Sequence, residues 1–232
     1  MQKITTPDGS VTFHNEEFDE AYHSKSGAKE EAVKKFVEPC LIKEIAKTGK
    51  LKILDVCFGL GYNTAAAIDA ALEENPNCMI DVVGLEKDHM ILEIASFLDA
   101  PFSHFYVIQD AIKNNYIYNK NNLKIPLVLP KELLIAKQLV IQIVLGDATK
   151  TIKEVTGEFD AIFFDPFSPK KCPELWTEEM FRECHRLLRK NGRLATYSCA
   201  RIVRDNMHAV GLTIIDGPKV WRRGPSTIGV KE

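Results

Sequence analysis

Short apolar runs alternate along the chain with segments of helical apolar spacing. Strand-length apolar runs occupy residues 51–56, 79–86, 138–145, 159–164, 192–198, 211–218 and 226–231. Apolar residues three and four positions apart mark helices at residues 26–47, 65–73, 89–98 and 178–188, the first interrupted at Pro39. Strands separated by helices predict β-α-β units. We therefore expect an α/β fold with a doubly wound, mostly parallel, seven-stranded sheet.

Two parts of the chain fit this alternation less well. The N-terminal stretch carries a T-P-D-G-S turn between short extended pieces, which predicts a hairpin. Residues 99–138 include NNYIYNKNN and a Pro-bounded LVLP, and they predict a helix plus an insertion, with residues 113–125 on the surface.

Length and composition indicate one domain over residues 1–232. The chain is 45% hydrophobic and can bury a core. No apolar run approaches the roughly 20 residues of a membrane span. The polar start MQKITTPDGS has no signal-peptide core. The six cysteines form no C-x-x-C pair and have no histidine at ligand spacing. We expect a cytoplasmic protein with reduced thiols, no bound metal and no membrane partner.

The net charge is only −2, but it is unevenly distributed. Up to Asp165 the chain has 17 lysines, no arginine and 25 acidic residues, whereas the remainder has 13 basic and 7 acidic residues. All eight arginines follow residue 181. This asymmetry is typical of an anion-facing surface. The alternative is a solvated helix face, since several of these arginines lie on or just after one predicted helix.

Four predicted strands end in distinctive polar or glycine residues. The first runs into Asp55-x-x-x-Gly59-x-Gly61, the second ends in Glu86, the third in Gly146-Asp147-Ala148 and the fourth in Asp165. Ligands collect at the carboxyl ends of the strands in such sheets. The glycines would let a ligand approach the backbone beside a helix N-terminus. Thr64 stands where the dinucleotide fingerprint needs a third glycine, which counts against NAD or FAD.

Each strand-end acid alone is more often a cap or turn residue than a ligand contact. Taken together, they resemble the class I S-adenosylmethionine-dependent methyltransferases, which have a Rossmann-like sheet with an antiparallel closing strand. The resemblance implies that Glu86 binds the cofactor ribose, that Asp147 and Ala148 flank its adenine, and that the loop from Asp55 to Gly61 holds its methionine portion.

A closer resemblance covers nearly the whole chain. The segments TPDGSVTFHNEEFDEAYHSKSGAKEEAVKKF, CFGLGYNT and DPFSPKKCPELWT resemble the MnmC-type tRNA methyltransferases. The resemblance implies methylation of the 5-aminomethyl group on the wobble (2-thio)uridine of tRNA, bound through its anticodon stem-loop. It also implies a stand-alone methyltransferase without the FAD-dependent oxidase domain. We expect a monomer in which residues 1–50 form an extension that covers the site.

Together these arguments give two sets of expected site residues. The cofactor set, for S-adenosyl-L-methionine, is Tyr22, Ser24, Asp55, Phe58, Gly59, Gly61, Asn63, Thr64, Glu86, Lys87, Asp147, Ala148 and Asp165. The substrate set is His23, Pro166, Phe167, Trp176, Arg201 and Arg222. Within it, an aromatic residue between two prolines is poorly placed for a core, so Phe167 should line a pocket. Trp176 is more typical of packing.

Asp165 is the expected catalytic residue. Methyl transfer from a sulfonium to an amine needs the nitrogen lone pair, whereas a nearby carboxylate raises the pKa of the amine and keeps it protonated. A strong base is therefore not the expected role. We expect Asp165 to orient the amine and to stabilise the positive charge that grows on nitrogen.

Two alternatives stay open at this point. The first is a small-amine transferase, either an aminopropyltransferase or a small-molecule N-methyltransferase. It would need a second acid soon after Asp165, yet residues 166–173 contain only Lys170 and Lys171 as charged residues. The second is a non-catalytic RNA-binding module, which need not bind S-adenosylmethionine.

Overall fold

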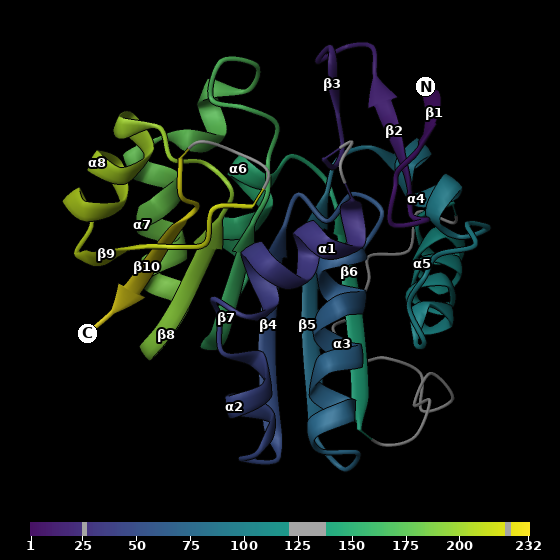
Figure 1. The fold of residues 1–232 in the computed structure, drawn as a ribbon, viewed down its shortest axis with the longest axis horizontal. Coiled ribbons are helices and arrows are strands. Elements are labelled where there is room, and N and C mark those ends of the chain that lie inside the picture. The colour runs from purple at the N-terminus through teal and green to yellow at the C-terminus, as the bar shows by residue number, and fades with distance from the viewer. Residues whose placement is uncertain (25–26, 121–137, 221–223) are drawn as a thin grey trace.

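The seven-stranded sheet has the strand order of a doubly wound fold. The structure is a computed structural model, and it describes residues 1–24, 27–120, 138–220 and 224–232. The strands lie in the order β6 (Leu139–Leu145), β5 (Met79–Glu86), β4 (Lys50–Val56), β7 (Phe159–Phe164), β8 (Leu188–Thr196), β10 (Thr227–Lys231) and β9 (Leu212–Asp216) (Figure 1). The first five are parallel, and β10 runs antiparallel to both its neighbours. The expected α/β fold and sheet are confirmed.

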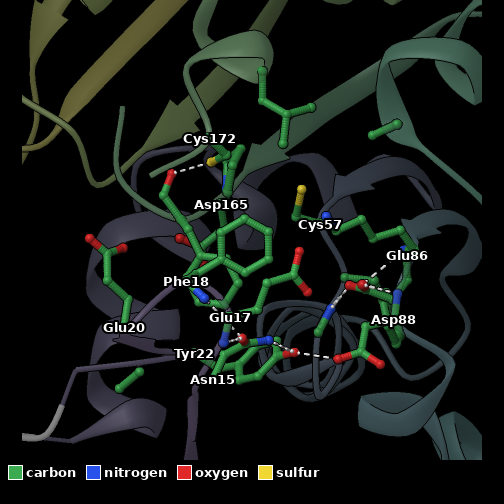
Figure 2. Close-up of a pocket in the computed structure, with 18 of the residues that line it drawn as sticks. Asn15, Glu17, Phe18, Glu20, Tyr22, Cys57, Glu86, Asp88, Asp165 and Cys172 are labelled. Carbon is green, nitrogen blue, oxygen red and sulfur yellow. Dashed lines mark hydrogen bonds between the residues drawn. The ribbon is translucent and has the colours of Figure 1, made fainter. Parts of the chain in front are cut away.

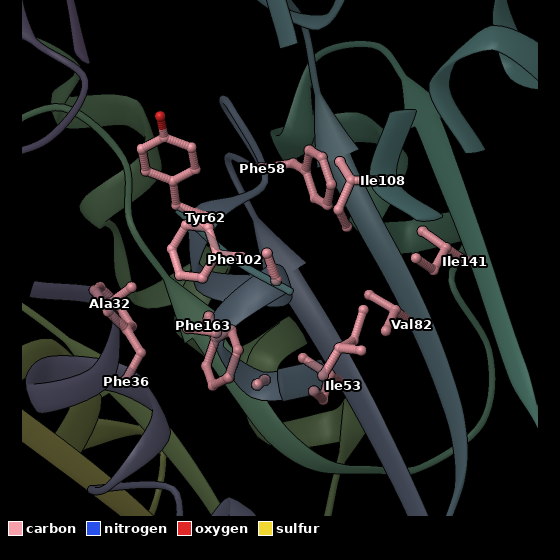
Figure 3. Packing of buried hydrophobic residues seen from close by; sticks show 14 of the residues in the cluster. Ala32, Phe36, Ile53, Phe58, Tyr62, Val82, Phe102, Ile108, Ile141 and Phe163 are labelled. Atoms are coloured by element: carbon pink, nitrogen blue, oxygen red, sulfur yellow. The ribbon is translucent and has the colours of Figure 1, made fainter. Parts of the chain in front are cut away.

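Helices cover both faces of the sheet because its strands are apolar on both sides. On one face lie α1 (Ala28–Ala32), η1 (Val33–Val37), α2 (Ile42–Ala46), α3 (Tyr62–Glu74), α4 (His89–Ala95) and α5 (Phe105–Lys120). On the other lie α6 (Ala148–Thr151), η3 (Ile152–Glu154), η4 (Pro173–Trp176), α7 (Glu178–Leu187) and α8 (Arg201–Ala209). In β7, Phe163 packs in the first core and Phe164 in the second, as the alternation of side chains in a strand requires (Figure 3).

A small antiparallel sheet precedes the large one. It consists of β1 (Gln2–Thr5), β2 (Val11–Asn15) and β3 (Glu20–Ala21), so the expected hairpin gains a third strand. In Figure 1 this sheet stands beyond the carboxyl ends of the central strands. The Asp8 carboxylate accepts hydrogen bonds from the Ser10 amide and from the hydroxyls of Thr6 and Ser10, which fixes the predicted turn.

Several element boundaries differ from the expected ones for local reasons. The first helix is divided into α1, η1 and α2, and a turn that includes Pro39 breaks it as expected. Strand β8 starts directly at the end of α7, four residues before residue 192. The early start of β8 is accommodated by the left-handed backbone of Asn191, at φ 64°, and by a shift in the pairing register between β8 and β7. The predicted helix within residues 99–138 is α5. Of the expected surface segment 113–125, Lys113 is exposed, and the side chains of residues 114–125 lie outside what the structure describes.

Candidate active site

A cavity of about 800 Å³ lies at the carboxyl ends of the central strands (Figure 2). One wall comes from the segments that follow β4, β5, β6 and β7, and the facing wall comes from the N-terminal segment 15–24 together with Glu31. This is the crevice in which open α/β sheets bind ligands.

The turn after β4 is shaped by left-handed backbone and by one aromatic ring. Cys57, Gly59 and Gly61 have φ values of 64°, 56° and 78°, which glycine adopts without cost and cysteine does not. The ring of Phe58, only 3% exposed, packs where glycines leave room. A Cβ added at Gly61 or Gly84 would lie 2.7 or 2.5 Å from it. Phe58 therefore anchors the turn against the sheet while the backbone of Gly59 faces the cavity.

Glu86, at the end of β5, accepts three backbone hydrogen bonds. Its Oε2 accepts from the amide of Gly59 at 2.7 Å, and its Oε1 accepts from the amides of Lys87 and Asp88, each at 2.8 Å. Burial raises the pKa of this carboxyl, although the three amides oppose the shift. The side chain lines the cavity and also joins the β4 turn to the end of β5.

Asp55 lies beneath the turn and is fully buried. Thr64 donates its hydroxyl to Oδ2 at 2.7 Å, whereas Oδ1 has no hydrogen-bond partner within the described structure. The pKa of Asp55 is raised to about 8, mainly by burial and in part by the nearby carboxylates of Asp165 and Glu86, while the hydrogen bond from Thr64 opposes the shift. An unsatisfied buried carboxyl oxygen at this place suits a ligand that carries a positively charged sulfonium or ammonium group. The residues present therefore fit a cationic nucleoside cofactor.

Asp165 follows β7 and lines the cavity in a fixed orientation. Its amide donates to the carbonyl of Val56 at 3.2 Å. The buried side chain of Asn63, at the start of α3, donates Nδ2 to Oδ2 of Asp165 at 2.9 Å. The amide of Asn63 thus holds one carboxylate oxygen, which sets the direction of the other.

The loop after Asp165 is held by two side chains of the second core. Tyr197 donates its hydroxyl to the carbonyl of Pro166 at 3.0 Å, and Trp176 donates Nε1 to the carbonyl of Phe167 at 2.8 Å. The ring of Phe167 is stacked on Phe18 with centroids 4.7 Å apart. Both phenylalanine rings line the cavity.

The N-terminal segment is attached to two separate parts of the site. Glu20 accepts hydrogen bonds from the amide of Ser168, at 2.8 Å, and from its hydroxyl. Tyr22 donates its hydroxyl to Asp88, in the loop after β5, at 2.8 Å (Figure 2). The segment therefore bridges the loop after β7 and the loop after β5.

The structure brings most of the expected site residues together. Twelve line the cavity, namely Tyr22, His23, Ser24, Phe58, Gly59, Glu86, Lys87, Asp147, Ala148, Asp165, Pro166 and Phe167. Six do not, namely Asp55, Gly61, Asn63, Thr64, Trp176 and Arg201. Arg222 lies outside the described residues.

The residues that do not line the cavity fall into two kinds. Thr64 donates to Asp55, Asn63 donates to Asp165, and Gly61 leaves room for the ring of Phe58. Trp176 is 3% exposed and packs in the second core. Their place is to support the site, and Trp176 has the packing role that is typical of its residue type. Arg201 begins α8, with its side chain 94% exposed and 3.5 Å from Asp205.

Sequence reasoning missed a group of N-terminal acids. Glu16, Glu17, Glu20 and Glu31 line the cavity, as do Asp88 and Glu174. The acidic run in HNEEFDEAYHS was the available signal, because a charged run beside a hairpin need not face solvent. Together with the expected acids Glu86, Asp147 and Asp165, these side chains make the cavity lining strongly acidic, and Lys87 is the only lysine among the described lining residues.

The arginine-rich half of the chain is largely ion-paired on its surface. Arg182, Arg189, Arg201 and Arg204 each pair with an acidic side chain, and Arg186 pairs with Glu183 and also reaches two backbone carbonyls. Arg193 donates to the carbonyl of Pro39. Of the two interpretations of the charge asymmetry, these contacts favour the paired, solvated face.

Two further features are absent from the part of the chain that the structure describes. None of its helices has the length and apolarity that a membrane crossing requires. Within the same residues, no group of three or more His, Cys, Asp or Glu side chains is arranged to hold a metal ion.

Comparison with known proteins gives consistent matches. Residues 115–232 match the family model described as S-adenosyl-L-methionine-dependent methyltransferase. The solved structure of MNMC2 from Aquifex aeolicus superposes with a TM-score of 0.77 at 31% identity, covering 98% of this chain and 69% of that one.

Curated sequences agree with these matches. The uncharacterized protein MJ0670 of Methanocaldococcus jannaschii is 31% identical over 98% of this chain. The tRNA 5-methylaminomethyl-2-thiouridine biosynthesis bifunctional protein MnmC of Dichelobacter nodosus is 25% identical over 87% of it. The matched parts are 59% and 32% of those two proteins. The chain belongs to the S-adenosyl-L-methionine-dependent methyltransferases and is of the MnmC type.

Proposed function

We propose that this protein transfers the methyl group of S-adenosylmethionine to the 5-aminomethyl group of a wobble (2-thio)uridine in tRNA. The observation that carries the proposal is the carboxylate of Asp165, held by Asn63 at 2.9 Å on the cavity wall beside the ring of Phe167. The named relatives support the choice of acceptor, because the Dichelobacter nodosus protein is named for the biosynthesis of 5-methylaminomethyl-2-thiouridine in tRNA.

Each part of the cavity has a role in this reaction. Glu86, Asp147 and Ala148 would hold the adenosine portion of the cofactor, which supplies the electrophilic methyl group. Asp165 would accept a hydrogen bond from the acceptor amine and align its lone pair with that methyl group. The stacked rings of Phe18 and Phe167 offer an apolar face to a uracil base.

The charge of Asp165 acts on the transition state rather than on proton removal. As nitrogen attacks, the sulfonium loses its positive charge and nitrogen gains it. A fixed carboxylate beside the nitrogen stabilises that new charge without reorganising. The proton then leaves to solvent, because a carboxylate next to an ammonium is a weak base for it.

Single-turnover methylation tests the proposal. The substrate is tRNA that carries 5-aminomethyluridine, and the product is identified by nucleoside analysis. Asp165→Asn should slow transfer by roughly 100-fold or more, the scale of losing a preorganised electrostatic partner. Affinity for S-adenosylhomocysteine and the melting temperature should change little.

Asp216→Asn is the matched control for that experiment. Asp216 also ends a strand, β9, but its carboxylate is 65% exposed and pairs with Arg204. Its variant should methylate at the wild-type rate. Equal rates for Asp165→Asn and wild type would contradict the role of Asp165, and absence of product from wild-type enzyme would contradict the choice of acceptor.

A second candidate, methyl or aminopropyl transfer to a small polyamine, is favoured by one observation. The cavity carries the acids Glu17, Glu20 and Glu174 near Asp165, although none of them lies among residues 166–173. Such a wall attracts a small polycation and repels RNA phosphates. Competing putrescine or spermidine against the tRNA substrate separates the two, since a polyamine acceptor would be consumed and labelled.

A further inference from the structure

A buried ion pair lies at the edge of the cavity, away from Asp165. Glu31 of α1 and Lys35 of η1 are 7% and 3% exposed, and Nζ of Lys35 lies 2.5 Å from Oε1 of Glu31. Oε2 of Glu31 accepts from the amide of Ser24 at 2.6 Å. Glu31 lines the cavity, whereas Lys35 is not among its described lining residues.

Stability alone does not account for this pair. Desolvating two charges costs several kcal/mol per ion, and apolar side chains of similar volume are commonly as stable or more stable. The same helical region contains a second i,i+4 pair, Lys34–Glu38, which is about half exposed and costs no such desolvation. A buried carboxylate that faces a cavity is better explained by a ligand.

The charge of Glu31 is well defined. Burial alone would raise the pKa of Glu31, but Lys35, the Ser24 amide and His23 reverse the shift, so its pKa is lowered. Burial lowers the pKa of His23 to about 4, so its imidazole is neutral near pH 7. Glu31 is therefore an anion that has one donor on each oxygen among the described residues, whereas a carboxylate accepts about four hydrogen bonds.

The place of Glu31 in the fold indicates which end of the cofactor would lie beside it. Asp147 follows β6 and Glu86 follows β5, and these strands are neighbours at one edge of the sheet. A cofactor with its adenosine there must carry its sulfur and amino-acid end toward β4 and β7. Helix α1 packs on α3, the helix that follows β4, so Glu31 lies at that end.

We propose that the carboxylate of Glu31, held in place by Lys35, binds the α-ammonium group of the methionine end of S-adenosylmethionine. The ammonium would donate to the remaining acceptor positions of Glu31 that face the cavity. Lys35 stays behind the carboxylate as its permanent counter-ion. This inference concerns the cofactor, so it does not depend on which amine accepts the methyl group.

Three ligands with an uncharged sulfur separate the contribution of the ammonium group from that of the rest of the cofactor. S-adenosylhomocysteine has the complete amino-acid end, its deaminated analogue lacks only the ammonium, and 5′-methylthioadenosine lacks the whole end. By calorimetry, wild-type protein should bind S-adenosylhomocysteine about 10- to 100-fold more tightly than the deaminated analogue, the range of a charge-assisted hydrogen bond. A ratio near one in wild type would overturn the proposal outright.

Glu31→Gln should remove most of that preference. The amide keeps the size of the side chain, so affinity for 5′-methylthioadenosine should stay within about twofold, while the preference for the ammonium falls to about threefold or less. Glu38→Gln is the matched control, because it neutralises the exposed pair of the same region, and it should retain the full preference.

Loss of the ion pair could also act through folding, and a double variant separates the two effects. Glu31→Gln with Lys35→Met removes both charges and leaves no unpaired buried cation. It should show the same reduced preference as Glu31→Gln. If either variant keeps the full preference for S-adenosylhomocysteine over its deaminated analogue, or weakens all three ligands equally, the pair has only a structural role.

Discussion

Asp55 has a pKa far above that of an ordinary aspartate. A carboxyl with a pKa of about 8 is protonated at neutral pH when the site holds no cation. Its pKa is raised first by burial, and the proximity of Asp165 and Glu86 adds to the effect. The strand end is thus tuned for a positively charged ligand, since such a ligand would favour the ionised form of Asp55.

This shift makes the stability of the cofactor-free protein depend on pH. The ordinary pKa of Asp55 is 3.8 and its folded value is about 8, so between these limits the unfolded chain has lost a proton that the folded protein keeps. Stability therefore falls as pH rises from about 4 to 8. Asp55→Asn keeps an acceptor for Thr64 but does not titrate, so it should reduce this fall.

Thermal melts without cofactor, from pH 5 to pH 8, check this expectation. The melting temperature of Asp55→Asn should exceed that of wild type by more at pH 8 than at pH 5. Part of the fall should remain in the variant, because burial also raises the pKa of Glu86. If the melting temperatures of the two proteins changed equally with pH, the raised pKa of Asp55 would be contradicted.

Glu86 gives a second prediction at the level of single residues. Glu86→Ala should weaken cofactor binding by about 2–3 kcal/mol, because it removes a charge-assisted acceptor for the ribose. The loss should be the same for 5′-methylthioadenosine and S-adenosylhomocysteine, since both carry the ribose. An unchanged dissociation constant would mean that the ribose binds elsewhere.

At the scale of elements, the loop after β7 depends on the N-terminal segment. The carboxylate of Glu20 takes the amide and hydroxyl of Ser168, and the ring of Phe18 covers Phe167. The prolines at 166 and 169 restrict the backbone between these contacts, which lowers the entropy lost on ordering the loop. Glu20 of β3, in the small sheet, thereby fixes the position of the loop that follows β7 of the large sheet.

Removal of this attachment should loosen the loop without unfolding the protein. Glu20→Ala should speed amide hydrogen exchange of residues 165–172 by about tenfold, on the scale of losing a charge-assisted bond, while exchange in β4 and β5 stays slow. Glu16→Ala is the control, because Glu16 lies 3.3 Å from the N-terminal amine instead. Equal exchange of the loop in both variants would show that Phe18 and the prolines suffice.

At the scale of the whole molecule, charge is unevenly distributed along the chain. The cavity is anionic, whereas the second half of the chain carries all eight arginines. Surface ion pairs contribute little to stability, so Arg182, Arg201 and Arg204, whose acidic partners are exposed, can exchange an acid for a phosphate at small cost. Under the proposed function, these arginines would contact the RNA backbone while a single base entered the cavity.

Salt dependence measures this arrangement directly. If tRNA is the substrate, its affinity should fall steeply with salt while the affinity for S-adenosylhomocysteine barely changes. Arg182→Ala and Arg201→Ala should each reduce the salt slope by about one unit where the side chain meets a phosphate. A flat response of tRNA binding would favour the polyamine acceptor.

The sequence predicted what is local, and it missed what depends on contacts between distant segments. The strand ends at Asp55, Glu86 and Asp165 could be identified because apolar strands stop there and polar residues follow. The acids of the facing wall could not, since Glu20 and Ser168 are 148 positions apart. The amide of Asn63 was expected to meet the cofactor, but it reaches Asp165 across 102 positions.

Because Trp176 donates a hydrogen bond to the carbonyl of Phe167, its fluorescence should report on the loop after β7. The chain has two tryptophans, so Trp221→Phe would leave Trp176 as the single indole emitter. That indole is buried and edge-on to Phe164 and Tyr197, and its N–H is bonded to the loop beside the cavity. Movement of the loop would change the polarity around the ring and shift its emission. Stopped-flow fluorescence of the unlabelled protein could then time the arrival of each ligand.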